Sequence, residues 1–409
     1  MNIRHVVSIA LLLLAAFAAQ AQEPKWVGSW GASPLPPSPG AGPFPATPSF
    51  SDQTVRQIVR LSVGGERVRL RLSNEYGAKP ITIGAARVAL ADGTDKLRAE
   101  HAVTFDGRAS ATIPAGAPLL SDPIELKVGD LAALSVSLYL QGETGPCTCH
   151  GVGMQDTYVS ARGDHTQGTF APEQTIQMRA FLSGVDVLAA RAQAIVVLGD
   201  SISDGVGSTA NANRRWPDLF AERLSARSGG TRFGVVNHGI SGNQVLSDGA
   251  GQSALARFDR DVLSVPGLTH VIVFEGVNDL GLGYGHLEGP LASLMPPPGI
   301  KPTRDAMIAG YRQIIARAHA KGVKIYGATI APYEGAAYYS AEGNAVRQAI
   351  NDWIRTSKEF DGVLDFDAAF RDPGKPTQMK DAFQAGDHLH GSDAGYRAVA
   401  DSIDLALFR

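Results

Sequence analysis

Residues 194–203 read Ala-Ile-Val-Val-Leu-Gly-Asp-Ser-Ile-Ser. The first five form a short apolar run typical of a buried strand, and glycine ends the run before polar residues begin. Similar runs recur toward the C-terminus, at residues 233–236, 271–274, 323–328 and 363–366. Helical periodicity fills the intervals, at residues 217–228, 253–262, 303–321, 341–359 and 393–407. This alternation predicts βαβ units and a parallel sheet between helices, a three-layer α/β/α fold.

Polar blocks follow the first three apolar runs and precede the last helical segment. Ser201 stands in the first block, Gly242 in Asn-His-Gly-Ile-Ser-Gly-Asn at 237–243, and Asn278 in Gly-Val-Asn-Asp at 276–279. Asp-His-Leu-His at 387–390 comes just before the final helix. The carboxyl ends of parallel strands meet at one edge of an open sheet, so we expect the four blocks to line one crevice.

These residue types supply the groups that acyl transfer requires. Ser201 is the candidate nucleophile, His390 the base that takes its proton, and Asp387 the carboxylate that orients the imidazole. The candidate oxyanion donors are the backbone N–H groups of Ser201 and Gly242 and the side-chain amide of Asn278. The sequence contains no Gly-x-Ser-x-Gly elbow, which argues against the α/β-hydrolase fold.

Other residues in or near the blocks compete for the same roles. His388 is an alternative base, but the separation of Asp387 and His390 suits a turn that folds the carboxylate toward the imidazole. Asp200 and Asp204 flank Ser201 and are expected to support its loop by hydrogen bonds. Alternative carboxylates for orienting the base are Asp279, Asp365 and Asp367.

With its four blocks in this order, the chain resembles the SGNH, or GDSL-type, hydrolases over residues 194–409. Residues 199–202, Gly-Asp-Ser-Ile, match the first family block, with isoleucine where the nominal pattern has leucine. The histidine at 388 departs from the small or apolar residue that the family often carries. The resemblance implies a flavodoxin-like α/β/α domain. It also implies family roles for a set of five residues: Ser201, Gly242, Asn278, Asp387 and His390.

From the resemblance we expect an exported serine esterase that hydrolyses carboxylic esters through an acyl-enzyme on Ser201, without metal or other cofactor. Two-domain members with an N-terminal β domain look like arylesterases, acylhydrolases and carbohydrate deacetylases. Short acyl esters, small or linked to polysaccharide, are therefore the first expected substrates. The alternatives are lysophospholipase or lipase activity, acyl transfer to a sugar hydroxyl by the same triad, and non-catalytic polysaccharide binding. The Gly- and Pro-rich segment 280–302 is a candidate cover for the acyl pocket, or a surface loop without substrate contact.

The N-terminus has the pattern of an export signal, expected at residues 1–21. Arg4 and His5 precede an apolar run at 6–17, and Ala-Gln-Ala at 19–21 suits a cleavage site. An uncleaved membrane anchor is the alternative, although the run is shorter than the roughly 20 residues that a spanning helix needs. We expect a soluble mature chain, beginning near Gln22, in the periplasm or outside the cell.

Residues 22–190 are expected to form an all-β domain, and residues 191–409 the catalytic domain. Runs rich in Val, Ile, Leu and Thr predict a sandwich or jelly roll, with strands near residues 55–63, 68–72, 81–90, 102–105, 111–113, 124–128 and 131–140. Alternation on both sides of Gly64-Gly65 predicts that the first two form a hairpin. The other face of this hairpin carries Arg56, Arg60, Arg67, Arg69 and Arg71. We interpret this face as solvated; the alternative is a binding surface for acidic polysaccharide or lipid head groups.

Charge and cysteine content narrow the range of partners. The formal net charge is −3, and no basic run with interleaved aromatic residues occurs, which argues against a nucleic-acid partner. The two cysteines, Cys147 and Cys149, can form a tight bridge or remain free thiols in an exported chain. Together with His150 they are alternative metal ligands, but no second pair at ligand spacing completes a site.

Overall fold

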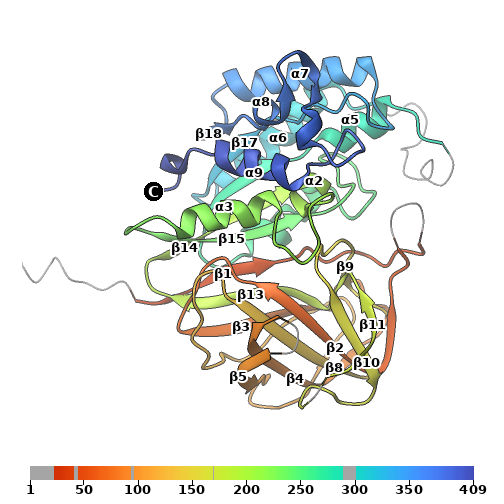
Figure 1. Cartoon of the computed structure of the whole chain (residues 1–409), viewed down its shortest axis with the longest axis vertical. Helices are drawn as coiled ribbons and strands as arrows, with labels where there is room; N and C mark the ends of the chain where they lie inside the picture. Colours follow the sequence, from red (N-terminus) through yellow and green to blue (C-terminus); the bar gives the residue numbers. More distant parts are fainter. Residues whose placement is uncertain (1–22, 41–44, 94–95, 169, 289–300) are drawn as a thin grey trace, which may run out of the picture.

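The computed structural model describes residues 23–40, 45–93, 96–168, 170–288 and 301–409 (Figure 1). The expected export signal at residues 1–21 lies outside the described residues. None of the helices in these five ranges combines the length and apolar character needed to span a bilayer.

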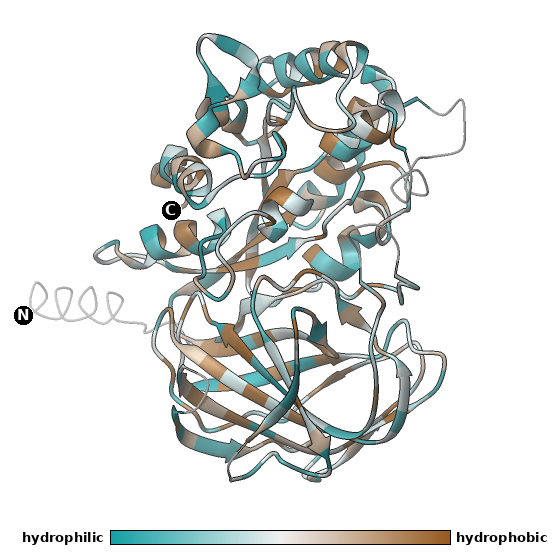
Figure 2. Ribbon diagram, turned by 45° about the vertical axis from the view of Figure 1, so that its right-hand side comes forward, coloured by the Kyte–Doolittle hydropathy of each residue, from teal (hydrophilic) through white to brown (hydrophobic). Residues whose placement is uncertain are grey.

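The N-terminal region is a sandwich of two antiparallel sheets, which confirms the predicted class. One sheet has the order β1 (Lys25–Gly31), β13 (Leu182–Ala189), β3 (Arg67–Ser73) and β7 (Pro118–Leu120). The other has the order β11 (Pro172–Ile176), β10 (Thr157–Arg162), β2 (Ser49–Arg60), β8 (Ala133–Pro146), β4 (Ile81–Asp92) and β5 (Lys96–Ala102), with β6 (Ala111–Ile113) also on β4. A small ladder joins β9 (Cys149–His150) to β12 (Arg179–Ala180). Figure 2 shows apolar residues spread along the strands of both sheets.

The predicted hairpin around Gly64-Gly65 is wrong. Strand β2 pairs with β8 and β10, whereas β3 pairs with β13 and β7, so the two strands belong to different sheets. Both strands turn alternate apolar residues inward, and the buried residues Val59 and Leu70 belong to one continuous core. Alternation along a strand indicates which face is buried but not which strand pairs with it. The local pattern therefore could not reveal that β2 and β3 lie in different sheets. Segment 124–128 likewise forms isolated bridges to residues 65 and 68 instead of a strand.

The five arginines do not share a solvated face, so this expectation is also wrong. Arg56 is buried and donates to Ser137, and Arg69 pairs with Asp186 at 2.9 Å. Arg60 and Arg71 reach the C-terminal region, where their partners are Glu222 and Ser264, while Arg67 stays exposed. Once β2 and β3 separate into two sheets, their arginines point toward different neighbours.

The C-terminal region contains a parallel sheet, as predicted. Within the described residues its strand order is β15 (Arg232–Gly239), β14 (Ala192–Gly199), β16 (Leu268–Phe274), β17 (Lys324–Ala328) and β18 (Gly362–Leu364). The first two strands in sequence are thus swapped in space, which is the flavodoxin-like order. A two-stranded ladder, β19 (Arg371–Asp372) with β20 (Lys375–Met379), lies outside this sheet.

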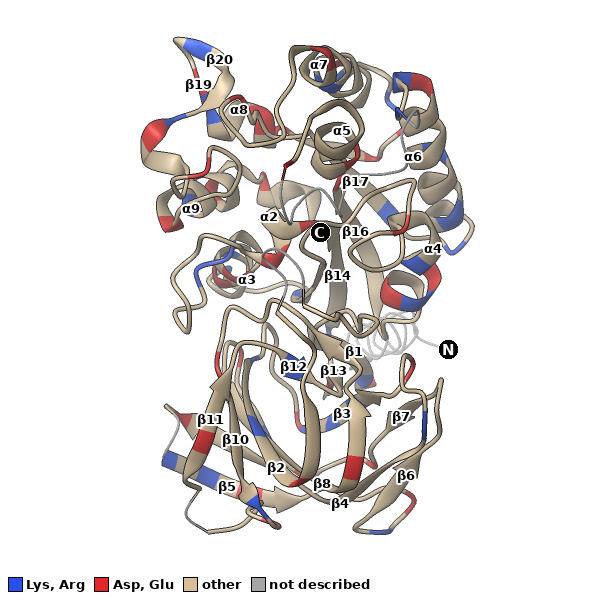
Figure 3. Cartoon of the chain, turned by 90° about the vertical axis from the view of Figure 1, so that its right-hand side faces the viewer, with Lys and Arg blue, Asp and Glu red and all other residues tan. Residues whose placement is uncertain are grey.

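Helices cover both faces of the parallel sheet (Figure 3). On one face, helices α3 (Trp216–Ser225) and α8 (Phe366–Phe370) both contact α9 (Asp393–Ser402). On the other lie α4 (Ala254–Phe258), the π-helix η2 (Asp259–Leu263), α6 (Arg304–His319) and α7 (Ala341–Thr356). Two helices begin just past strand ends: α2 (Ser201–Asp204) after β14 and α5 (Val277–Tyr284) after β16. Short 3-10 turns are η4 (Asp381–Phe383) and η5 (Leu405–Leu407).

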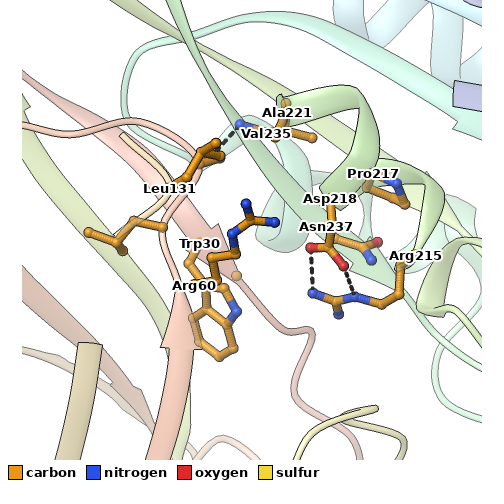
Figure 4. A pocket seen from close by; sticks show the side chains of 12 residues that line it. Trp30, Arg60, Leu131, Arg215, Pro217, Asp218, Ala221, Val235 and Asn237 are labelled. Atoms are coloured by element: carbon orange, nitrogen blue, oxygen red, sulfur yellow. Dashed lines mark hydrogen bonds and ion pairs between the residues drawn. The ribbon is translucent and has the colours of Figure 1, made fainter. Parts of the chain in front are cut away.

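The two regions pack closely where β1 lies against β15. A Cβ atom on Gly234 would stand 2.1 Å from the carbonyl oxygen of Gly28, so glycine is required for this backbone approach. The N–H of Val235 donates to the buried Ser62 hydroxyl at 2.8 Å. Figure 4 shows Arg60 among the residues that line the cavity beside this contact. The cavity has a volume of about 20 Å³, which is room for one water molecule.

Candidate active site

The nucleophile candidate Ser201 is the first residue of the four-residue helix α2. Asp200, directly after β14, caps this helix by accepting from the N–H of Ile202 at 2.9 Å, as the sequence predicted for its support of the loop. Burial raises the pKa of the Asp200 carboxyl, and the neighbouring Asp279 raises it further. The short helix therefore holds Ser201 at the carboxyl edge of the sheet.

The loop before α9 brings a histidine and a carboxylate to this serine. The Nε2 atom of His390 lies 2.8 Å from the Ser201 hydroxyl oxygen, and Nδ1 lies 2.5 Å from Oδ2 of Asp387. With Nδ1 donating to the carboxylate, Nε2 is free to accept from the hydroxyl. The other carboxylate oxygen, Oδ1, accepts from the backbone N–H groups of Leu389 and His390. The three side chains thus form one continuous chain of hydrogen bonds.

The electrostatics of Asp387 suit this arrangement. Partial burial acts to raise the pKa of the Asp387 carboxyl. The hydrogen bond and charge of the His390 imidazole, together with the backbone N–H groups of His390 and Leu389, outweigh burial and hold the pKa of Asp387 well below its usual range. The carboxylate therefore stays ionised beside the imidazole, where it stabilises the positive charge of a protonated ring.

The residues that competed for the roles of base and orienting carboxylate contact other groups. The ring of His388 lies against Gly335, and its backbone adopts a φ of 59°. Asp279 accepts from the N–H groups of Val245 and Leu246 and is turned toward that loop. The two remaining carboxylates pair with arginines: Asp365 with Arg355, and Asp367 with Arg347, Arg355 and Arg371.

The two oxyanion candidates reach the same edge from the second and third strands. Gly242 follows β15 and has a φ of 82°, a left-handed conformation that favours glycine. Asn278 lies in the first turn of α5, with its Nδ2 donating to the carbonyl of Asn243 at 3.0 Å. Its Oδ1 accepts from the hydroxyl of Tyr338 at 3.1 Å. An amide nitrogen carries two hydrogens, so the second remains for a ligand.

A buried arginine that sequence reasoning missed ties these strand ends together. Arg257 on α4 is fully buried and donates to the carbonyls of Gly199 and His238, at the ends of β14 and β15. It also bonds the side chain of Asn243 at 2.9 Å and that of Glu275 at 3.1 Å. No motif marked this residue, because its backbone and side-chain partners lie on separate segments that only the fold brings together.

Segment 280–302, the candidate cover for the acyl pocket, is only partly described by the structure. Its beginning belongs to α5 (Val277–Tyr284), and residues 289–300 lie outside the described residues. Tyr284 donates to the carbonyl of Pro302 at 3.0 Å, so both ends of the segment stand close together.

Cys147 and Cys149 form a disulfide with a Cα–Cα distance of 5.3 Å, and His150 bonds a carboxylate, so the three do not form a metal site. More generally, no group of three or more His, Cys, Asp or Glu side chains suited to a metal occurs within the described ranges.

Comparison with known proteins gave a family match and several similar solved structures. Residues 197–398 match the model of the GDSL-like Lipase/Acylhydrolase family. No curated protein gave a significant match. Similar solved structures include an acetyl xylan esterase from Geobacillus stearothermophilus, with 22% identity and a TM-score of 0.38, covering 53% of this chain and 94% of that one.

Two further solved structures are each similar over about half of the chain. A GDSL-like lipase from Bacteroides thetaiotaomicron has 17% identity and a TM-score of 0.39, covering 53% of this chain and 87% of that one. The lipase/acylhydrolase from Enterococcus faecalis has 19% identity and a TM-score of 0.37, covering 51% and 92%. By its family match, the chain carries a GDSL-like lipase/acylhydrolase domain at residues 197–398 and is a carboxylic ester hydrolase.

Proposed function

We propose that the chain is an exported serine esterase that cleaves short-chain acyl esters in two steps through an acyl-enzyme on Ser201. One observation carries the proposal: His390 lies with Nε2 at 2.8 Å from the Ser201 hydroxyl and Nδ1 at 2.5 Å from Asp387. This is the hydrogen-bond relay that makes a weakly acidic hydroxyl nucleophilic.

In the first step, the Ser201 oxygen attacks the ester carbonyl carbon while its proton passes to Nε2 of His390. The ionised Asp387 stabilises the imidazolium that results, and His390 then protonates the departing alcohol. In the second step, water attacks the acyl group, gives its proton to His390, and the free acid leaves as the proton returns to Ser201. The ester bond to the alcohol breaks once, and the acyl group is transferred to water.

The oxyanion formed in each step needs donors aimed at one point. The proposed donors are the N–H groups of Ser201 and Gly242 and the free amide hydrogen of Asn278. The fixed amide of Asn278, bonded at both ends, supports this assignment, because donors that are already oriented need no rearrangement as charge develops.

Export and substrate size rest on separate observations. A disulfide between Cys147 and Cys149 fits an oxidising compartment and supports export, as does the leader-like sequence. The buried ring of Tyr338 stands against Gly281 beside Asn278, which supports a preference for short acyl groups such as acetate.

A panel of p-nitrophenyl esters of increasing acyl length tests this preference, and higher activity on long chains would favour a lipase. Adding a sugar acceptor and measuring acyl-sugar against free acid tests for transfer.

We also propose that residues 22–190 and 191–409 are the two structural units of the mature chain. The boundary falls between β13 and β14, where the sandwich ends and the parallel sheet begins.

The experiment that tests the nucleophile compares two neighbouring serines on α2. Ser201→Ala is expected to abolish hydrolysis of p-nitrophenyl acetate. Ser203→Ala is the matched control, since the Ser203 hydroxyl is buried and finds no hydrogen-bond partner among the described residues. It should keep both the activity and the melting temperature of the native chain. Full turnover by Ser201→Ala would contradict the proposal.

A further inference from the structure

A buried histidine–aspartate contact crosses from the N-terminal sandwich to the catalytic loops. Nε2 of His150, on β9, lies 2.9 Å from Oδ1 of Asp204, the last residue of the nucleophile helix α2. Their side chains are 6% and 3% exposed, so the contact is shielded from solvent. In a buried contact of this kind the geometry is held tightly, because losing either partner leaves a desolvated charge.

The surroundings of His150 favour the doubly protonated ring. Nδ1 faces the carbonyl oxygen of Ser33 at 3.0 Å, and Nε2 faces the carbonyl of Val152 as well as Asp204. These partners are acceptors, so each ring nitrogen has to donate. Burial lowers the pKa of His150, but the charge and hydrogen bond of Asp204, together with the hydrogen bond to the Ser33 carbonyl, outweigh burial and raise the pKa above the ordinary value of 6.5. The pair is therefore an imidazolium–carboxylate pair.

The other carboxylate oxygen of Asp204 holds the loop that contains Gly242. Oδ2 accepts from the backbone N–H of Ser241 at 3.1 Å and from the Ser241 hydroxyl at 2.8 Å. Gly242 is the next residue, and the following Asn243 accepts from the amide of Asn278. Asp204 thus connects the helix that presents the nucleophile with the loop that presents an oxyanion donor.

The N-terminal side of the contact is itself fixed. His150 pairs in register with Arg179 on β12, and Cys149, its neighbour, is in the disulfide with Cys147. Cys149 also forms an isolated bridge with Leu35. The backbone around His150 is therefore fixed, and its ring can act as a fixed support for Asp204.

We propose that His150 is a positioning residue for the ester hydrolysis proposed above: through Asp204 it holds the loop that presents the Gly242 N–H. The N-terminal sandwich then contributes to catalysis through Asp204, although none of its described residues bonds the side chains of Ser201 or His390. The inference rests on the proposed function, because it concerns the oxyanion site of that reaction.

His150→Ala is expected to lower kcat for p-nitrophenyl acetate by about 100-fold, the effect of moving a catalytic group by about 1 Å, with little change in KM. His150→Gln retains an N–H that can donate to Asp204, and it should recover part of the loss. In an Asp204→Ala background, His150→Ala should cause no further decrease, because the histidine acts through the aspartate.

A thionoester separates positioning from a mere loss of folded protein. Sulfur is the weaker hydrogen-bond acceptor, so an intact oxyanion site accelerates the ester more than the matched thionoester. The ester-to-thionoester rate ratio should fall in His150→Ala, whereas a smaller folded fraction lowers both rates equally and leaves the ratio unchanged.

The matched control is Ser62→Ala, which removes another buried hydrogen bond across the same interface, to Val235, far along β15 from Gly242. It should lower the melting temperature and leave kcat and the ratio unchanged. Native kcat or an unchanged ratio in His150→Ala would overturn the inference while leaving the proposed esterase intact. Absence of Ser201-dependent hydrolysis in the native chain would instead overturn the proposed function.

Discussion

At the scale of single residues, the most constrained group of the proposed oxyanion site is the Asn278 amide. Its nitrogen donates to Asn243 and its oxygen accepts from Tyr338, so the plane of the amide is set from two directions. Tyr338 is buried, and its ring stands 6.0 Å from that of Tyr333. The tyrosine hydroxyl therefore has a fixed position from which to orient the amide.

Tyr338→Phe removes this orienting bond and keeps the ring. We expect kcat for p-nitrophenyl acetate to fall about fivefold, the effect of one hydrogen bond worth about 1 kcal/mol. Asn278→Ala should cost on the order of 100-fold or more, because it removes a donor altogether. The control is Tyr339→Phe, a neighbour whose ring packs on Tyr333. Equal effects of the two Tyr→Phe changes would contradict an orienting role for Tyr338.

At the scale of helices and strands, the sequence predicted the elements of the C-terminal region well. The apolar run at 194–198 lies in β14, and residues 303–321 contain α6, because period and burial are properties of each segment alone. The expectation that Ser201, Gly242 and Asn278 share one sheet edge followed from their places after successive strands, and these segments do converge there.

Partners across the fold could not be predicted in the same way. The hairpin failed because β2 and β3 bury alternate residues against one core from two different sheets. Arg257 and Tyr338 were missed, and His150 was considered only as a metal ligand, because their partners include residues distant in sequence, such as Ser33 for His150. Such contacts depend on how distant segments pack together, and the periodicity or motifs of a single segment do not predict that packing.

At the scale of the whole molecule, the His150–Asp204 pair links the stability of the chain to pH. The pKa of His150 is raised in the folded state, so its stabilising contribution is fully present below the unfolded value of about 6.5. The contribution is lost as pH rises through the raised folded value. Besides Asp204, the charge of Arg215 also acts on the ring and lowers the pKa of His150.

The difference in melting temperature between the native chain and His150→Gln should therefore be larger at pH 5.5 than at pH 9. Differential scanning calorimetry at the two pH values measures it. The corresponding difference for Ser62→Ala should not change with pH, since its partner is a backbone N–H. A His150→Gln difference that stays constant or grows toward pH 9 would contradict an imidazolium at this position.

The central claim is that Ser201 becomes covalently acylated with the help of His390. The most direct measurement is peptide mass mapping after reaction with an organophosphonate ester, which traps an activated serine as a stable adduct. We predict one adduct per chain, on Ser201, with its formation strongly slowed in His390→Ala. Complete loss of activity with Ser201 unmodified, or an adduct on a different residue, would contradict the claim.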